Sequence, residues 1–344
     1  MNVFYLTGPT GAGKTALGIE FALKIGAEII SMDSMAVYRG MEIGTAVPTA
    51  EERARVPHHL VGFRDPACEY SLADYLRDAR AVAGEVLGRG KRVLYVGGTP
   101  LYLKALLRGL FEGPPADAAF REEMFHRAVE QPPGWLHERL CEVDRRTADR
   151  LHPNDTRRII RALEVYRTTG TPISVLQRQF DRPVPREDCR VYVLDRPREI
   201  LYDRINGRVG AMLEAGLLEE ARALWERLRD IPNATAAQAV GYRELFGYFE
   251  AQETLLKATP RETTARDDAP REETLSETLE AIRRHSRQFA KRQGTWFRSL
   301  SECRFVSPSE LETVIRGPWR AVGGSPPRIV RPRVHGGRLN AEDQ

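Results

Sequence analysis

One segment near the N-terminus constrains the fold of this chain more than any other part of the sequence. It consists of Gly8, Pro9, Thr10, Gly11, Ala12, Gly13, Lys14 and Thr15, in the pattern G-x-x-x-x-G-K-T. Glycines in such a loop let the backbone adopt positive φ and bring successive N–H groups close to phosphate oxygens. Lys14 supplies a positive charge for the outermost phosphate, and the Thr15 hydroxyl is placed to coordinate Mg²⁺. The pattern therefore predicts a phosphate-binding loop and leaves the identity of the phosphate compound open.

The sequence on either side of the loop also fits a phosphate site. Residues 3–6 form a short apolar run that predicts a buried strand, and residues 16–24 predict a helix. The N-terminus of that helix would add its positive dipole end to the anion site. A chance match in a glycine-rich turn would not require this order of strand, loop and helix, so we interpret the segment as functional.

Three further apolar runs predict more strands of an α/β sheet. They cover residues 27–32, 92–96 and 190–194. Ligands of an open α/β sheet bind beyond the carboxyl ends of its strands, so Asp33 should lie near the phosphate-binding loop. There it could bind a magnesium-bound water or accept a proton from a substrate, unless it only caps a turn. The Gly-Gly-Thr sequence of residues 97–99 predicts a second loop of close approach at the same edge.

The strand signals divide the chain into an α/β core and a helical insertion. Between residues 114 and 185 the strand signals stop, and charged helical segments lie between boundaries rich in proline and glycine. We predict a discontinuous core of residues 1–113 and 186–316 around a helical insertion domain of residues 114–185. Residues 250–276 are predicted to be a flexible polar insertion, and residues 317–344 a disordered tail. The predicted fold is a P-loop NTPase-like parallel sheet with flanking helices and an inserted all-helical domain.

Composition excludes several classes of protein. Hydrophobic residues make up 42% and charged residues 29% of the 344 residues, and no apolar run approaches the ~20 residues that span a membrane. The chain starts with a predicted strand rather than a signal peptide, so we expect a cytoplasmic protein without membrane contact. The four cysteines are scattered without a C-x-x-C pair, which argues against a zinc site or a disulfide framework. The adjacent His58 and His59 cannot face the same way, so we expect structural histidines rather than a metal pair.

Basic residues gather in two clusters, although the net charge is only +4. The first cluster is Arg157, Arg158 and Arg161, and the second is Arg283, Arg284, Arg287, Lys291, Arg292 and Arg298. Such clusters are typical of contacts with a polyanion, but each could also be a solvated helix face. Arg204 and Arg208 share one face of a predicted helix, where they are either solvated or close to the site.

Taken together, the motifs of the chain resemble those of the tRNA dimethylallyltransferase family. The matching segments are residues 8–15, 33–41, 44–46, 96–99, 152–155, 161–164, 241–244 and 288–293. They follow one another in the right order from residue 3 to about residue 300, which is far more specific than the phosphate-binding loop alone. The chain differs from the usual pattern at Ala36 and Val47, where members of the family often have Gln and Lys.

The resemblance implies a reaction and its substrates. Dimethylallyl diphosphate would give its five-carbon group to N6 of the adenosine just 3′ of the anticodon, in tRNAs that read codons beginning with U. Diphosphate would leave, so the loop would hold a prenyl diphosphate rather than a nucleotide to be hydrolysed. The implied partners are dimethylallyl diphosphate and the anticodon stem-loop of tRNA, the implied cofactor is Mg²⁺ at Thr15, and we expect a monomer.

The resemblance also implies roles for individual residues. Asp33 would take a proton from N6, Arg208 would bind the diphosphate, and Thr99 would contact the target nucleotide or the diphosphate. Diphosphate binding is assigned to residues 8–15. The implied tRNA contacts are Asp33, Ser34, Met35, Ala36, Thr99, Arg121, Arg157, Arg158, Ile159, Ile160, Arg161, Gly241, Tyr242, Arg243, Lys291 and Arg292.

Three other functions remain open on the residues alone. A small-molecule kinase would use ATP at the same loop and would not need a prenyl diphosphate. A prenyltransferase of free AMP, ADP or ATP would need neither the basic clusters nor the helical insertion. A non-catalytic RNA-binding protein would leave Lys14, Thr15 and Asp33 unexplained.

Overall fold

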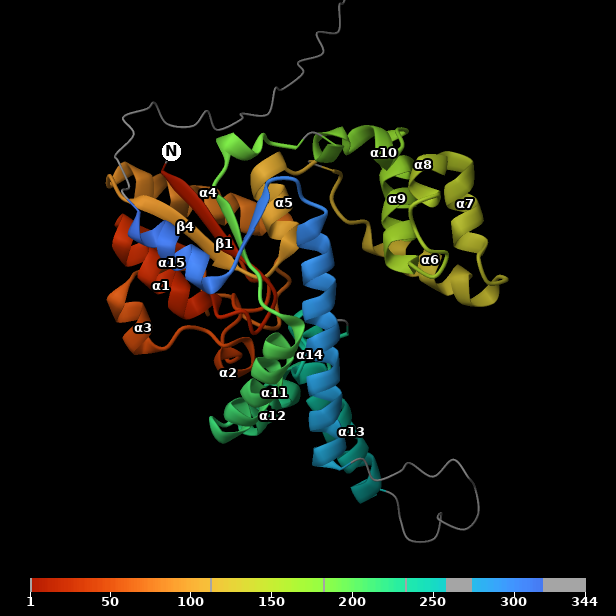
Figure 1. Cartoon of the computed structure of the whole chain (residues 1–344). Helices are drawn as coiled ribbons and strands as arrows, with labels where there is room; N and C mark the ends of the chain where they lie inside the picture. The colour runs from red at the N-terminus through yellow and green to blue at the C-terminus, as the bar shows by residue number, and fades with distance from the viewer. Residues whose placement is uncertain (1, 112, 182, 233, 258–273, 318–344) are drawn as a thin grey trace, which may run out of the picture.

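In the part of the chain that the structure describes, six parallel strands form a central sheet in the order β3-β2-β4-β1-β5-β6. The structure is a computed structural model, and it describes residues 2–111, 113–181, 183–232, 234–257 and 274–317 (Figure 1). The strands are β1 (Val3–Thr7), β2 (Ala27–Ser31), β3 (His58–His59), β4 (Arg92–Gly97), β5 (Val191–Leu194) and β6 (Cys303–Val306). Because β4 pairs with both β1 and β2, the loops that follow these three strands leave the same edge of the sheet.

The four strands predicted from apolar runs are confirmed as β1, β2, β4 and β5. The two strands that were not predicted, β3 and β6, lie at the edges of the sheet. A continuous apolar run marks a strand that is buried on both faces, and neither edge strand has one. His58 and His59 make up all of β3, while Arg304 and Phe305 of β6 are exposed.

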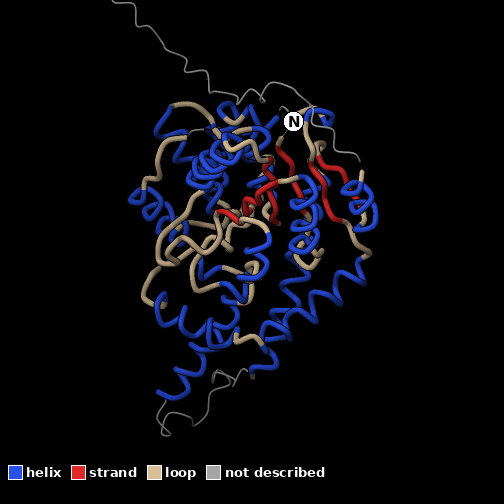
Figure 2. The backbone as a smooth tube through the Cα atoms, turned by 90° about the vertical axis from the view of Figure 1, so that its left-hand side faces the viewer, coloured by secondary structure: helices blue, strands red, loops and turns tan. Residues whose placement is uncertain are grey.

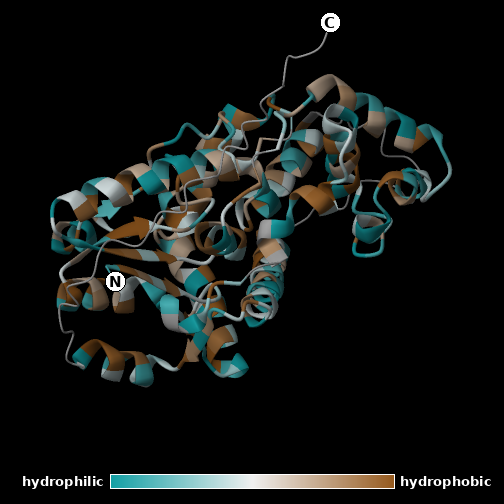
Figure 3. Cartoon of the chain, turned by 90° about the horizontal axis from the view of Figure 1, so that it is seen from above, coloured by the Kyte–Doolittle hydropathy of each residue, from teal (hydrophilic) through white to brown (hydrophobic). Residues whose placement is uncertain are grey.

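Helices cover both faces of the sheet, as Figures 2 and 3 show around the central strands. Alternate residues of β1 enter two hydrophobic clusters: Phe4 packs with Phe21 on one face, and Tyr5 packs with Tyr75 on the other. The helices of the core are α1 (Lys14–Ile25), α2 (Glu42–Thr45), α3 (Ala50–Arg55), α4 (Leu72–Gly88), α5 (Pro100–Arg108), α11 (Arg198–Glu214), α12 (Leu217–Leu228), α13 (Tyr242–Lys257), α14 (Leu275–Arg298) and α15 (Pro308–Arg316).

Five helices between β4 and β5 form a separate body with its own hydrophobic cluster, to the right of α14 in Figure 1. They are α6 (Ala118–Glu130), α7 (Trp135–Val143), α8 (Arg145–Ala148), α9 (Thr156–Thr169) and α10 (Ile173–Leu176). Short 3₁₀ segments at Arg178–Asp181 and Arg186–Asp188 lead back to β5, and a third lies at Ala236–Gln238. We propose that residues 114–185 are a helical insertion domain, because their apolar side chains pack on one another in a cluster distinct from the two beside the sheet.

A buried ion pair connects the C-terminal end of this insertion to the core. Arg108, at the end of α5, donates from Nε to Glu302 Oε1 at 2.7 Å. The same arginine donates from Nη1 to the carbonyl of Phe180 at 2.6 Å, and Val184 N donates to Glu302 Oε1 at 3.1 Å. Glu302 is fully buried, so its carboxylate depends on these donors in place of water.

The predicted polar insertion at residues 250–276 is shorter than expected. Helix α13 continues to Lys257, and α14 begins at Leu275 behind a capping box formed by Thr274 and Glu277. The prediction of a flexible segment is therefore wrong at both of its ends, and residues 258–273 lie outside the described residues. The predicted tail also lies outside them from residue 318 onward. Among the helices of the described ranges, none combines the length and the hydrophobicity of a membrane span.

Candidate active site

The phosphate-binding loop joins the end of β1 to the start of α1 and depends on three glycines with positive φ. The φ angles are 142° at Gly8, 81° at Gly11 and 94° at Gly13. At Gly8 there is also no room for a side chain, because a Cβ there would lie 2.8 Å from the carbonyl oxygen of Leu194. No side chain caps the N-terminus of α1, so its first backbone N–H groups face the loop and can bind an anion.

Lys14 lies over the loop that it belongs to. Its Nζ donates to the carbonyls of Gly8 at 3.0 Å and Pro9 at 2.9 Å. Burial lowers the pKa of the Lys14 amine to about 8, the nearby Arg208 also lowers it, and Asp33 opposes the shift. A bound phosphate would raise the pKa of the amine again and favour its charged form, because its negative charge attracts the ammonium group more strongly than the two carbonyl dipoles do.

Arginines from the far side of the loop complete a cationic cradle. Arg208 Nη1 donates to Thr10 Oγ1 at 3.4 Å, and burial lowers the pKa of its guanidinium while Asp33 raises it. Arg204 Nε donates to the Gly11 carbonyl at 2.8 Å, and Arg196 Nε donates to the Ala12 carbonyl at 2.8 Å. Of the two interpretations of Arg204 and Arg208, the structure supports contact with the site. Arg196 was not predicted, although its position after β5 at the carboxyl edge could have indicated it.

Asp33 and Thr99 follow the neighbouring strands β2 and β4, at the edge of the sheet that carries the cradle. Asp33 Oδ1 accepts hydrogen bonds from Met35 N at 2.9 Å and Ala36 N at 3.3 Å, so the residue does cap a turn. Within the described residues, its second oxygen, Oδ2, makes no hydrogen bond and is available to a substrate. Thr99 Oγ1 accepts from Ser34 N at 3.1 Å, which joins the loops after β2 and β4. Asp33 therefore both shapes the turn and offers an oxygen to the site.

The loops after β1, β2 and β4 approach one another closely, as the Gly-Gly-Thr sequence predicts. A Cβ on Gly97 would lie 2.1 Å from the carbonyl oxygen of Met32, so only glycine fits there. A Cβ on Gly98 would lie 2.8 Å from Gln293 Nε2 and 3.4 Å from Lys14 Nζ. Gln293 of α14 thus reaches the centre of the site, a role that the sequence did not reveal.

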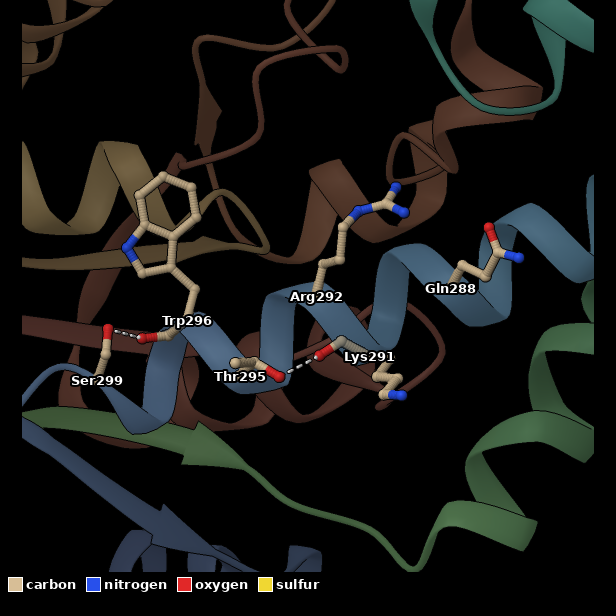
Figure 4. Close-up of a pocket in the computed structure, with 6 residues that line it drawn as sticks. All are labelled: Gln288, Lys291, Arg292, Thr295, Trp296 and Ser299. Carbon is tan, nitrogen blue, oxygen red and sulfur yellow. Dashed lines mark hydrogen bonds between the residues drawn. The ribbon is translucent and has the colours of Figure 1, made fainter. Parts of the chain in front are cut away.

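Part of the predicted RNA surface is exposed. Arg157 and Arg158 lie at the start of α9, and Lys291 and Arg292 lie on α14, with all four side chains exposed. A pocket of about 510 Å³ runs along α14. Its lining residues are Gln288, Lys291, Arg292, Thr295, Trp296 and Ser299 (Figure 4). Cations beside an aromatic ring are typical of a surface that binds single-stranded nucleic acid.

Four of the predicted tRNA contacts belong to the hydrophobic core: Ala36, which is 6% exposed, Ile159, Ile160 and Tyr242. Ile159 and Ile160 are 0% and 1% exposed and pack inside the insertion, so their side chains cannot reach an RNA bound at its surface. Tyr242 is also 0% exposed, and its hydroxyl donates to Glu220 Oε1 at 2.6 Å. We correct the prediction for these side chains. Gly241 is buried beside Tyr242, whereas Arg243 is exposed.

Two of the predicted RNA-binding arginines are held by a buried carboxylate. Glu164 is 1% exposed and accepts from Arg121 Nε and Nη2, both at 2.9 Å. Arg161 Nη1 binds the same carboxylate, and its Nη2 donates to the Pro114 carbonyl at 2.9 Å. These contacts fix the entrance of the insertion, so the two guanidinium groups have a structural role whether or not they also contact RNA.

The side chains do not form a dedicated metal cage in the part of the chain that the structure describes. No group of three or more His, Cys, Asp or Glu residues there could hold a metal ion. His58 Nδ1 lies 2.7 Å from the Val56 carbonyl, and His59 Nε2 lies 2.7 Å from Glu28 Oε2, which confirms them as structural histidines. A Mg²⁺ ion that shares its ligands between Thr15 and a bound diphosphate remains compatible with this site, because Mg²⁺ often binds through substrate phosphates.

Comparison with known proteins identifies relatives over most of the chain. A family model described as IPP transferase matches residues 36–300, and one described as isopentenyl transferase matches residues 1–57. The tRNA dimethylallyltransferase of Rhodopirellula baltica is 42% identical over 320 residues, which cover 91% of this chain and 90% of the relative. That of Geobacillus thermodenitrificans is 42% identical, with 87% and 88% covered.

Solved structures agree with these relatives. The tRNA isopentenylpyrophosphate transferase from Bacillus halodurans aligns with a TM-score of 0.62 and 34% identity, over 91% of this chain and 94% of that one. A eukaryotic dimethylallyltransferase acting on tRNA aligns with a TM-score of 0.68 and 26% identity, over 90% of this chain and 74% of that one.

Proposed function

The chain belongs to the tRNA dimethylallyltransferase family, and we propose that it transfers the dimethylallyl group of dimethylallyl diphosphate to tRNA. The acceptor is N6 of the adenosine just 3′ of the anticodon, in tRNAs that read codons beginning with U. The products are N6-(dimethylallyl)adenosine and diphosphate.

One observation carries the proposal. Burial lowers the pKa values of Lys14 and Arg208, and Asp33 lies close enough to both to oppose that shift, so a carboxylate and a cationic phosphate cradle share one site. A nucleotide-binding loop alone would explain the cations. The carboxylate opposite them supports a reaction in which a leaving diphosphate and a proton-releasing nucleophile meet.

Stabilisation of the leaving group supplies most of the catalysis in this proposal. The lone pair of the adenine amine is delocalised into the ring, so the amine is a weak nucleophile. The allylic carbon becomes a good electrophile once the diphosphate can depart. Lys14, Arg208 and the N–H groups at the start of α1 are fixed where negative charge develops on the leaving oxygen.

Asp33 completes the transfer by accepting a proton. The N6–carbon bond forms as the bond between the allylic carbon and the diphosphate oxygen breaks. The proton lost from N6 passes to Asp33 Oδ2, while Oδ1 stays bound to the turn amides that orient the carboxylate. Thr99, held against Ser34, lies beside this carboxylate and contacts the target nucleotide or the diphosphate.

Mg²⁺ fits the Thr15 hydroxyl at the start of α1 together with oxygens of the diphosphate. When bound, the ion would neutralise part of the charge on the leaving group. In this proposal Lys14 and Arg208 bind the diphosphate directly.

The anticodon stem-loop is bound between α14 and the insertion in this proposal. Exposed Arg157 and Arg158 face RNA from the insertion, and Lys291 and Arg292 do so from α14. Anticodon loops are single-stranded, so the target base leaves its stack at lower cost than in a duplex. One chain supplies every group named here, so we expect a monomer. We also expect the protein to act in the cytoplasm.

Incubation with radiolabelled dimethylallyl diphosphate and total tRNA, followed by nucleoside analysis, tests the proposal. Label in N6-(dimethylallyl)adenosine is the expected result. Consumption of ATP without any need for the prenyl diphosphate would indicate a small-molecule kinase. Preferential labelling of free AMP over an anticodon stem-loop in the same reaction would indicate a nucleotide prenyltransferase.

A further inference from the structure

The Gln293 side chain of α14 bridges the phosphate-binding loop and the loop of Thr99. The backbone N–H of Thr10 donates to its Oε1 at 2.9 Å. Its Nε2 donates to the carbonyl of Gly98 at 2.6 Å. The residue is 4% exposed, so water does not compete for either contact. It therefore sits between the two halves of the site although it lies far from both in the sequence.

The amide of Gln293 satisfies both partners, because it has one group that accepts and one that donates. The Thr10 N–H can only donate and the Gly98 carbonyl can only accept, which also fixes the orientation of the amide. A carboxylate at this position would lack the donor, and an ammonium group would lack the acceptor. An apolar side chain would leave two buried backbone groups without partners, at a cost for each.

The two hydrogen bonds connect Gln293 to the loop that binds the leaving group and to the loop beside the proposed base. The hydroxyl of Thr10 accepts a hydrogen bond from Arg208, so the backbone of Thr10 is part of the diphosphate cradle. Gly98 directly precedes Thr99, which accepts from Ser34 beside the proposed base. We propose that Gln293 is a positioning residue that sets the separation between the leaving-group cradle and the acceptor loop. This inference rests on the proposed function.

The same helix also carries the proposed RNA surface. Lys291 and Arg292 are exposed and line the pocket along α14, whereas Gln293 turns inward from the next position. Substitution at position 293 should therefore change diphosphate binding and turnover without weakening RNA binding. Substitution of Lys291 should weaken RNA binding instead.

The decisive variant is Gln293→Met, because methionine keeps the length of the side chain and removes both hydrogen bonds. Isothermal titration with diphosphate should show a Kd about tenfold weaker at unchanged stoichiometry, as expected when hydrogen bonds of ordinary strength are lost. Turnover of dimethylallyl diphosphate and tRNA should fall about 10- to 100-fold. The Kd of an anticodon stem-loop should stay within about twofold. Gln293→Ala should give the same pattern.

Gln252→Met is the matched control. Gln252 lies on α13 and donates to the hydroxyl of Tyr248 at 2.6 Å, in a part of the chain with no assigned role in binding or catalysis. Its diphosphate Kd and turnover should equal those of the wild type.

The outcomes separate this inference from the proposed function. A lower diphosphate stoichiometry with an unchanged Kd would show that Gln293 only supports folding, and would overturn the inference. Unchanged Kd and turnover in Gln293→Met would overturn it too. A wild-type protein that transfers no label to tRNA would instead refute the proposed function.

Discussion

The buried amine of Lys14 should give dimethylallyl diphosphate binding a steep dependence on pH. The pKa of this amine is lowered from 10.5 to about 8, first by burial and further by Arg208. In the free protein Lys14 is therefore charged at neutral pH and loses its proton above about pH 8. A bound diphosphate favours the charged form and returns the pKa toward its ordinary value, so binding above pH 8 takes up a proton.

The size of the effect follows from these two values. If binding restores a pKa of 10.5, affinity falls about tenfold for each pH unit above 8. Between pH 7 and pH 9.5 the loss is about thirtyfold, since roughly one free molecule in thirty is still protonated at the higher pH.

Isothermal titration of dimethylallyl diphosphate across this range, in buffers of different ionisation enthalpy, measures both the Kd and the proton uptake. Lys14→Arg is the matched control, because a guanidinium stays charged throughout and its profile should be flat. A wild-type profile that is as flat as that of the control would refute the reasoning, because Lys14 would then be charged at all of these pH values.

Three further predictions address the base, the RNA surface and the insertion. Asp33→Ala should lower turnover by about 10²–10⁴-fold while tRNA still binds, and near-normal turnover would exclude Asp33 as the base. Replacement of Arg157 and Arg158 by Gln should make the dependence of tRNA affinity on salt less steep. The magnitude of the slope of log K (association constant) against log salt concentration should fall by about 1 to 2, whereas an unchanged slope would indicate that the two arginines are merely solvated. Glu164→Ala should lower the free energy of unfolding by about 2–4 kcal/mol in urea titrations, because it leaves two arginines without their buried partner; a loss below about 1 kcal/mol would contradict that role.

The sequence predicted the parts of the fold that depend on local patterns. Mainly apolar runs identified β1, β2, β4 and β5, because strands buried on both faces consist mostly of apolar residues, although β2 also contains the buried Glu28 and Ser31. The two-residue strand β3 owes its existence to its pairing with β2, which no local pattern reveals.

The same limit applies to the candidate site. Asp33 could be placed near the loop because the ends of parallel strands meet at one edge of a sheet. Motif matches, however, do not distinguish a residue that touches a ligand from one that supports its neighbours. Ile159, Ile160 and Tyr242 are of the second kind, since they are buried. Gln293 contacts loops that are far away in the chain, so only the folded structure reveals its role.

The strand order has one more consequence for the reaction. The cradle follows β1 and the base follows β2, and β4 lies between these two strands. Neighbouring strands are about 4.8 Å apart, so the ends of β1 and β2 lie roughly 10 Å from each other in the sheet. The loops that carry the cradle and the proposed base therefore begin at a fixed distance from each other. The backbone hydrogen bonds of the sheet fix this starting distance, and the Gln293 side chain then connects the loops that extend beyond the ends of β1 and β4.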